Sequence, residues 1–138
     1  RAIDEMQRFL DYFPNSERAK QAQDIIFELQ DKLVYKELLN AQLYYNLGNY
    51  MGNNYQSAII TAQNALKEYP YTRYKETLSM LILKSKYQEA VQSIEEKKPE
   101  RFRDVIDEYY SFINDYPSGE YSKEAENIFK VANKYVKD

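Results

Sequence analysis

The sequence predicts an all-α fold, a solenoid of stacked helical hairpins with about six helices, one of them long. Three aromatic–proline pairs end matching apolar stripes: Phe13-Pro14, Tyr69-Pro70 and Tyr116-Pro117. Counted back from each proline, the apolar residues fall at the same offsets, which place them on one face of an α-helix. The helix after each proline repeats as well, so the unit is a pair of helices around an aromatic–proline turn. Repeats of paired helices stack into solenoids, most of which bind other proteins.

Two helices are expected before Gly48. The first covers about residues 2–12 and ends at the first aromatic–proline turn. The stretch 17–47 has no glycine or proline and predicts one long helix, with a kink near Val34-Tyr35 as the alternative. Ser16 can cap this helix by accepting backbone N–H bonds, and Gly48 ends it, as glycine does at helix C-termini. The first apolar stripe is Ala2, Ile3, Met6, Phe9, Leu10 and Phe13.

Four further helices are expected after a loop at 49–54. Their ranges are about 55–68, 73–95, 99–115 and 121–136. Thr72 is placed to cap the second of these helices, and Pro99 suits the first turn of the third. Small residues at the helix crossings and prolines at the turns are the tetratricopeptide pattern. The core stripe of the helix over 73–95 is expected at Leu78, Leu81, Ile82, Tyr87, Ala90 and Val91.

The composition argues against several classes of function. The chain has no histidine and no cysteine, so we expect no catalytic residue, no metal site and no cofactor, and we expect that the protein is not an enzyme. Its net charge of -3, with lysines alternating with acids, argues against nucleic-acid binding, which needs a basic face. Tyrosine is the outlier, with 15 copies; most of these rings are expected between helices, and the rest at a partner surface.

Segments between about Met6 and Leu78 resemble one family of helical-repeat proteins. These segments are Phe9-Leu10-Asp11-Tyr12-Phe13-Pro14-Asn15-Ser16, Leu29-Gln30-Asp31-Lys32-Leu33, Tyr35-Lys36-Glu37, Tyr44-Tyr45-Asn46-Leu47-Gly48, Tyr55-Gln56-Ser57-Ala58-Ile59 and Lys67-Glu68-Tyr69-Pro70-Tyr71-Thr72. In them the chain resembles the C-terminal repeats of BamD-like outer membrane assembly lipoproteins, a tetratricopeptide-repeat family. The Asn-rich loop at 51–54 departs from the compact loop of that family.

The resemblance implies a scaffold of the β-barrel assembly machinery on the periplasmic side of the bacterial outer membrane. Its implied partners are the periplasmic domains of the barrel-forming subunit and other assembly lipoproteins, with no nucleic acid. Membrane attachment is implied only through a lipid anchor, which we expect to be absent from this chain. By similarity, docking is expected where the long helix ends and the next begins, at Tyr44, Tyr50, Asn53, Tyr55 and Gln56.

Residues 1–138 are expected to form a single repeat array, the C-terminal fragment of a longer protein, because the first stripe begins at once. Two other functions fit the same pattern. One is a generic tetratricopeptide adaptor that holds an extended peptide on its concave face. The other is an accessory helical domain of a cell-wall enzyme whose catalytic part lies elsewhere. The sequence upstream of Arg1 would separate the last function from the others.

Overall fold

The computed structural model describes residues 2–12 and 17–136, and over these residues the chain is all-α, without a strand. The elements in chain order are α1 (Ala2–Tyr12), α2 (Glu17–Leu47), α3 (Asn54–Glu68), α4 (Lys75–Val91), the 3-10 helix η1 (Glu95–Lys97), α5 (Lys98–Asp115) and α6 (Ser122–Val136). The prediction of six α-helices in hairpins is therefore confirmed. The predicted Phe13-Pro14 turn, the Ser16 cap and Arg1 lie outside the described residues.

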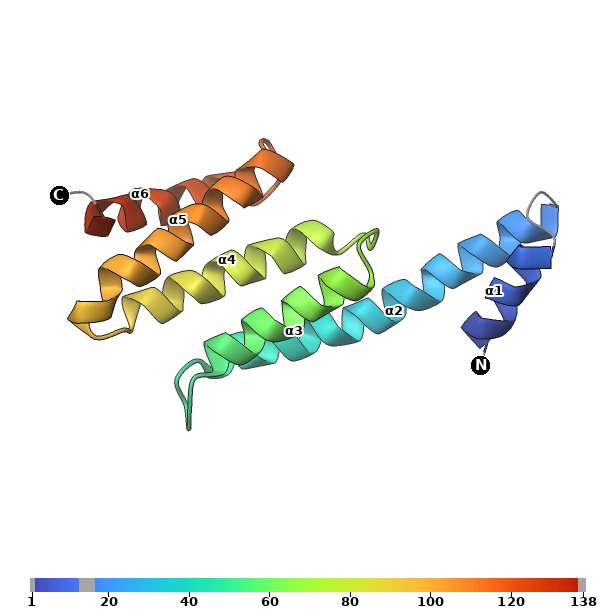
Figure 1. Ribbon diagram of the computed structural model, residues 1–138, viewed down its shortest axis with the longest axis horizontal. Helices are drawn as coiled ribbons and strands as arrows, with labels where there is room; N and C mark the ends of the chain where they lie inside the picture. The colour runs from blue at the N-terminus through green and yellow to red at the C-terminus, as the bar shows by residue number, and fades with distance from the viewer. Residues whose placement is uncertain (1, 13–16, 137–138) are drawn as a thin grey trace.

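The long helix α2 is the central element of the N-terminal half of the molecule, and α1, α3 and α4 all contact it (Figure 1). It is helical without interruption from Glu17 to Leu47, which confirms the predicted bounds of one long helix. Its 31 residues span about 45 Å at 1.5 Å per residue. Helix α1 packs on the N-terminal part of α2, whereas α3 and α4 pack on the C-terminal part. Helices α5 and α6 continue the array on the other side of α4.

Helix α4 lies between two hydrophobic cores. Its residues Leu78, Leu81 and Ile82 are buried with residues of α2 and α3, whereas Met80 and Leu83 are buried with residues of α5 and α6. Burial on both sides explains the differences from the predicted stripe. Met80 and Leu83 were not expected in the core, and the expected core residue Val91 is exposed because it closes the helix. A helix that is covered on both sides does not show a single apolar stripe.

The second and third aromatic–proline turns have nearly the same backbone geometry. Tyr69 has φ −129° and ψ 66°, and Tyr116 has φ −134° and ψ 65°. Each closes its helix by donating its backbone N–H to the carbonyl oxygen four residues earlier, at 2.9 Å from Tyr69 and 2.8 Å from Tyr116. These hydrogen bonds satisfy carbonyl groups that a helix C-terminus leaves open.

The ends of α4 differ from the prediction. The helix begins at Lys75, and its N-cap position is occupied by Tyr74 without a side-chain hydrogen bond. Thr72 lies two residues earlier, where its Oγ1 accepts a hydrogen bond from the backbone N–H of Tyr74 at 3.3 Å, so it orders the turn and does not cap the helix. The helix ends at Val91, earlier than predicted, and Ile94 adopts an extended conformation (φ −64°, ψ 152°) before η1 begins.

Candidate functional site

The turn between α2 and α3 carries the residues predicted to dock a partner. Gly48 ends α2 with φ 57°, the left-handed conformation expected for glycine at this position, and its N–H reaches the carbonyl oxygen of Tyr44 at 3.1 Å. Tyr44 and Tyr50 are exposed, and so are Asn53 and Gln56. Tyr55, in contrast, is only 8 % exposed, so its ring packs inside the hairpin and offers no contact area to a partner in this structure. The docking role of these residues stays a prediction.

Side chains at the C-terminal end of α4 and directly after it hold this turn in place. Asn53 accepts a hydrogen bond from the backbone N–H of Gln56 at 3.2 Å and donates one to Glu89 Oε2 at 2.7 Å. Gln92 accepts a hydrogen bond from Asn49 Nδ2 and donates one to the Tyr55 hydroxyl at 3.0 Å. Three exposed amides, those of Asn49, Asn53 and Gln92, thus fix the turn against a part of the chain that is remote in the sequence. A turn held in this way loses little conformational entropy when it binds a partner.

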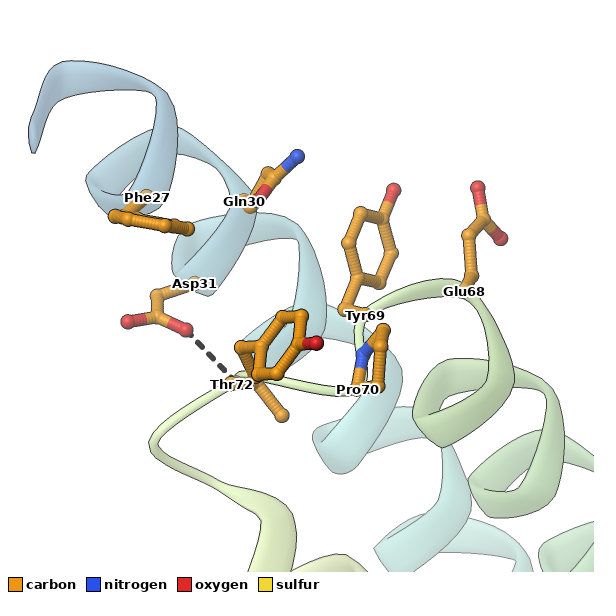
Figure 2. Close-up of a pocket in the computed structure, with 8 residues that line it drawn as sticks. Phe27, Gln30, Asp31, Glu68, Tyr69, Pro70 and Thr72 are labelled. Carbon is orange, nitrogen blue, oxygen red and sulfur yellow. Dashed lines mark hydrogen bonds between the residues drawn. The ribbon is translucent and has the colours of Figure 1, made fainter. Parts of the chain in front are cut away.

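A groove surrounds Tyr69 at the turn between α3 and α4. Three adjoining cavities of about 190, 240 and 590 Å³ share Glu68 and Tyr69 as lining residues, and together they form what we call the Tyr69 groove. The smallest cavity lies between the middle of α2, at Phe27, and the turn at Pro70 (Figure 2). The largest reaches Ile3 of α1. The groove thus follows α2 from α1 to the end of α3.

The lining of the Tyr69 groove is amphipathic. Aliphatic side chains contribute part of the surface, from Ile3 on α1 and from Leu29 and Leu33 on α2. Charged side chains of both signs also line the groove: Asp4, Asp31, Lys32, Lys36, Glu37 and Glu68. An open groove with an apolar lining and mixed charges suits an amphipathic peptide segment better than a small molecule, which is usually enclosed.

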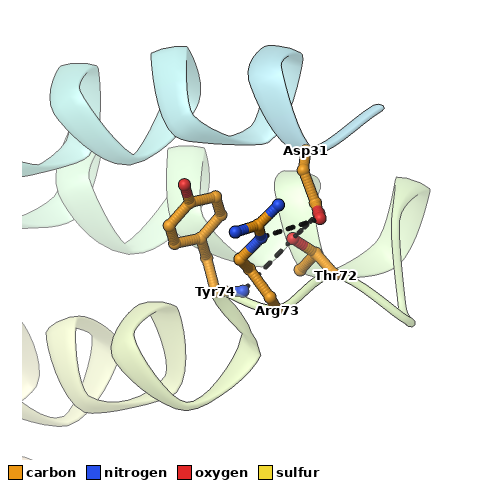
Figure 3. A network of polar contacts seen from close by, with 4 residues as sticks. All are labelled: Asp31, Thr72, Arg73 and Tyr74. Atoms are coloured by element: carbon orange, nitrogen blue, oxygen red, sulfur yellow. Dashed lines mark hydrogen bonds and ion pairs between the residues drawn. The ribbon is translucent and has the colours of Figure 1, made fainter. Parts of the chain in front are cut away.

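One wall of the groove is fixed by a polar network between α2 and the α3–α4 turn (Figure 3). The Thr72 hydroxyl donates to Asp31 Oδ1 at 2.7 Å, and Arg73 Nε donates to Asp31 Oδ2 at 3.1 Å. The ring of Tyr74 adds a tilted contact with Tyr35, with 5.5 Å between the ring centres. Burial acts to raise the pKa of Asp31, but the hydrogen bonds from Thr72 and Arg73 and the charge of Arg73 outweigh it, so this pKa lies below its ordinary value.

Within residues 2–12 and 17–136 no three potential metal ligands of the types His, Cys, Asp and Glu come together. None of the described helices combines the length and the apolar character needed to cross a bilayer. The strongly held carboxylate, Asp31, is engaged by Thr72 and Arg73 and fixes a turn.

Reading the sequence did not identify several exposed apolar residues next to the predicted docking residues. Leu39, Leu43 and Leu47 on α2 and Met51 in the turn are all exposed. The leucines look like core residues of a helix, and only the structure shows that they lie on its free side. A signal for this surface was nevertheless present, because the chain carries no charged residue between Glu37 and Lys67.

Comparison with known proteins gives one family. A family model described as YfiO, outer membrane lipoprotein, matches residues 1–81, which is more than half of the 138 residues. The matched part includes α1, α2, α3 and the start of α4, and it therefore contains both the α2–α3 turn and the Tyr69 groove. No curated protein matches the chain.

Proposed function

Since the chain belongs to the YfiO family of outer membrane lipoproteins, we propose that it is a helical-repeat scaffold of the machinery that assembles β-barrel proteins into the outer membrane. The family match carries this proposal, because it spans the helices on which the candidate docking residues lie. In this proposal the protein works on the periplasmic side of the membrane. It docks on the periplasmic domains of the barrel-forming subunit and contacts other assembly lipoproteins.

The proposed role is binding and not catalysis. Stacked hairpins with two shared cores hold their surface side chains in fixed relative positions, which is what a scaffold requires. The α2–α3 turn is the proposed docking point, since it presents Tyr44, Tyr50 and Gln56 to solvent on a backbone that α4 holds in place. Exposed tyrosines bury a large area at low entropic cost when they bind a protein.

A pull-down tests the proposal. A full-length version of the protein is immobilised and incubated with the purified periplasmic domains of the barrel-forming subunit. We expect stoichiometric recovery of these domains, and an unrelated helical-repeat protein on the same matrix serves as the control. Failure to recover the domains above that control would refute the proposed scaffold role.

The Tyr69 groove favours a second candidate function, an adaptor for extended peptides. Titration with short peptides, monitored by tyrosine fluorescence, measures peptide binding to the groove, because Tyr69 lines all three of its cavities. Leu33→Asp places a charge in the groove, and Leu39→Asp makes the same change at an exposed leucine that does not line it. Saturable peptide binding that is lost in the first variant and kept in the second would support the adaptor. Absence of saturable binding would contradict it.

A further inference from the structure

Residues 38–66, which form the C-terminal end of α2, the following turn and most of α3, carry no formal charge. Charged residues make up 30 % of the chain, yet none occurs between Glu37 and Lys67. This segment also contains many of the large exposed apolar side chains: Leu39, Leu43, Tyr44, Leu47, Tyr50, Met51 and Ile60. Surface helices of soluble domains normally carry charges on their solvent side, so a neutral and partly apolar one needs an explanation.

The exposed leucines of α2 form one stripe. Leu39, Leu43 and Leu47 follow one another at intervals of four residues and therefore lie along one side of the helix. The buried residues of the same part of α2, Leu38 and Ala41, point to the opposite side, where α3 and α4 pack. The stripe leads toward the turn with Tyr50 and Met51, and we call Leu39, Leu43, Leu47, Tyr50 and Met51 the neutral face.

The backbone conformation of the turn keeps the side chain of Met51 exposed. Met51 has φ 57°, a left-handed conformation uncommon for a side chain of this kind, and it is 90 % exposed. Asn54 holds the turn closed, since its backbone N–H reaches the Gly48 carbonyl at 2.9 Å and its Nδ2 reaches the Tyr50 carbonyl at 2.7 Å. A strained residue that is kept in place by its surroundings is a recurrent feature of binding sites.

Charged side chains border this surface. Lys36 precedes Leu39 by three residues on α2 and marks the N-terminal end of the stripe. Glu89 accepts a hydrogen bond from Asn53, and the Nζ of Lys84 lies 4.9 Å from the ring centre of Tyr45, so both α4 charges contact the side of the hairpin that faces α4. On the neutral face itself no side chain could compensate a charge of the partner. A partner charge buried there would lose its hydration without gaining a counter-charge.

From these observations we propose that the neutral face docks a folded protein partner through an equally apolar, uncharged patch on that partner. The inference rests on the proposed function and specifies the surface that the partner of the scaffold uses. Interface cores are depleted in charge and enriched in tyrosine and methionine, as this face is. An anionic membrane surface is a poorer match, because it would require lysines or arginines on the face.

Binding of the full-length protein to the periplasmic domains of the barrel-forming subunit, measured by calorimetry, tests the inference. Tyr50→Lys and Leu43→Lys introduce a charge into the neutral face, and Tyr110→Lys makes the first of these changes at a tyrosine of α5 that is 55 % exposed and lies outside both this face and the Tyr69 groove. We expect the two face variants to weaken binding by about tenfold or more and the control to leave it unchanged. Because no charge pairs across the interface, the wild-type affinity should change by less than about threefold between about 0.05 M and about 0.5 M salt.

The possible outcomes separate the neutral-face inference from the proposed scaffold role. Wild-type binding that tolerates lysine at positions 43 and 50 would overturn the neutral-face inference and leave the scaffold role standing. Wild-type binding that collapses with rising salt would do the same, since charge pairs would then carry the interface. No binding of the wild-type protein would refute the scaffold role and the inference together. Circular dichroism spectra of the three variants confirm that each is folded.

Discussion

Substituting alanine for Gly48 should destabilise the protein through two separate effects. Gly48 adopts φ 57°, and a side chain in this left-handed region costs about 1 kcal/mol. A Cβ atom there would also lie 2.8 Å from the hydroxyl oxygen and 3.1 Å from the Cζ of Tyr55, closer than side chains normally approach. Tyr55 cannot yield freely, because it is buried against Tyr45 and accepts a hydrogen bond from Gln92. Such overpacking adds about 1–3 kcal/mol, so the expected total is about 2–4 kcal/mol.

Urea unfolding followed by far-UV circular dichroism measures this loss, and two further variants separate its causes. Gly48→Asn places the same Cβ atom in a residue that tolerates the left-handed region, so it should retain mainly the steric loss. Adding Tyr55→Phe removes the oxygen at 2.8 Å and should restore part of the stability, with a coupling energy of about 0.5–1.5 kcal/mol. A loss below about 0.5 kcal/mol for Gly48→Ala, with no coupling to position 55, would refute the reasoning.

Three further predictions concern the α3–α4 turn and the C-terminal core. Thr72→Val removes a buried hydroxyl that makes two hydrogen bonds and should lower the free energy of unfolding in urea by about 1–2 kcal/mol. Thr72→Ser keeps the hydroxyl and should lower it less. Equal losses in the two variants would contradict the role of the hydroxyl. Because the pKa of Asp31 is lowered on folding, its contribution to stability is present above its unfolded pKa of about 3.9 and is lost as the pH falls through the folded value. The stability difference between wild type and Asp31→Asn should therefore shrink on acidification, and a constant difference would argue against this role. Phe102→Ala leaves a cavity at a fully buried site and should lower the free energy of unfolding by about 3–5 kcal/mol. Phe27→Ala, at a residue that is 45 % exposed, should lower it far less. Similar shifts of the melting temperature in the two variants would contradict the assigned core.

The features that could be predicted from the sequence are those fixed by neighbouring residues. The length of α2 follows from the absence of glycine and proline over 17–47, and its end follows from Gly48. The turns at Tyr69 and Tyr116 follow from the aromatic–proline pairs, and the structure gives them nearly the same backbone angles. Local chemistry decides all of these, so a sequence pattern is enough to predict them.

The features that could not be predicted depend on residues far apart in the chain. Tyr44 and Tyr55 look equivalent in the sequence, but only Tyr55 is buried, where its hydroxyl meets Gln92, 37 residues away. Thr72 was expected to cap a helix, yet its hydroxyl bonds to Asp31, 41 residues away, which draws it to α2. Tertiary contacts of this kind override local preferences, and a single sequence does not reveal them.

The position of α4 between two cores has a consequence for how the array unfolds. In an ideal repeat protein each repeat adds its own free energy and an interface term, so the ends can unfold while the middle remains. Here Leu78 and Leu81 belong to one core, and Met80 and Leu83, on the same helix, belong to the other. Melting α4 would therefore dismantle both cores at once. The part of the chain from the C-terminal half of α2 to α6 should behave as one cooperative unit, in which amide protons of α3 and α5 exchange with solvent at similar free energies.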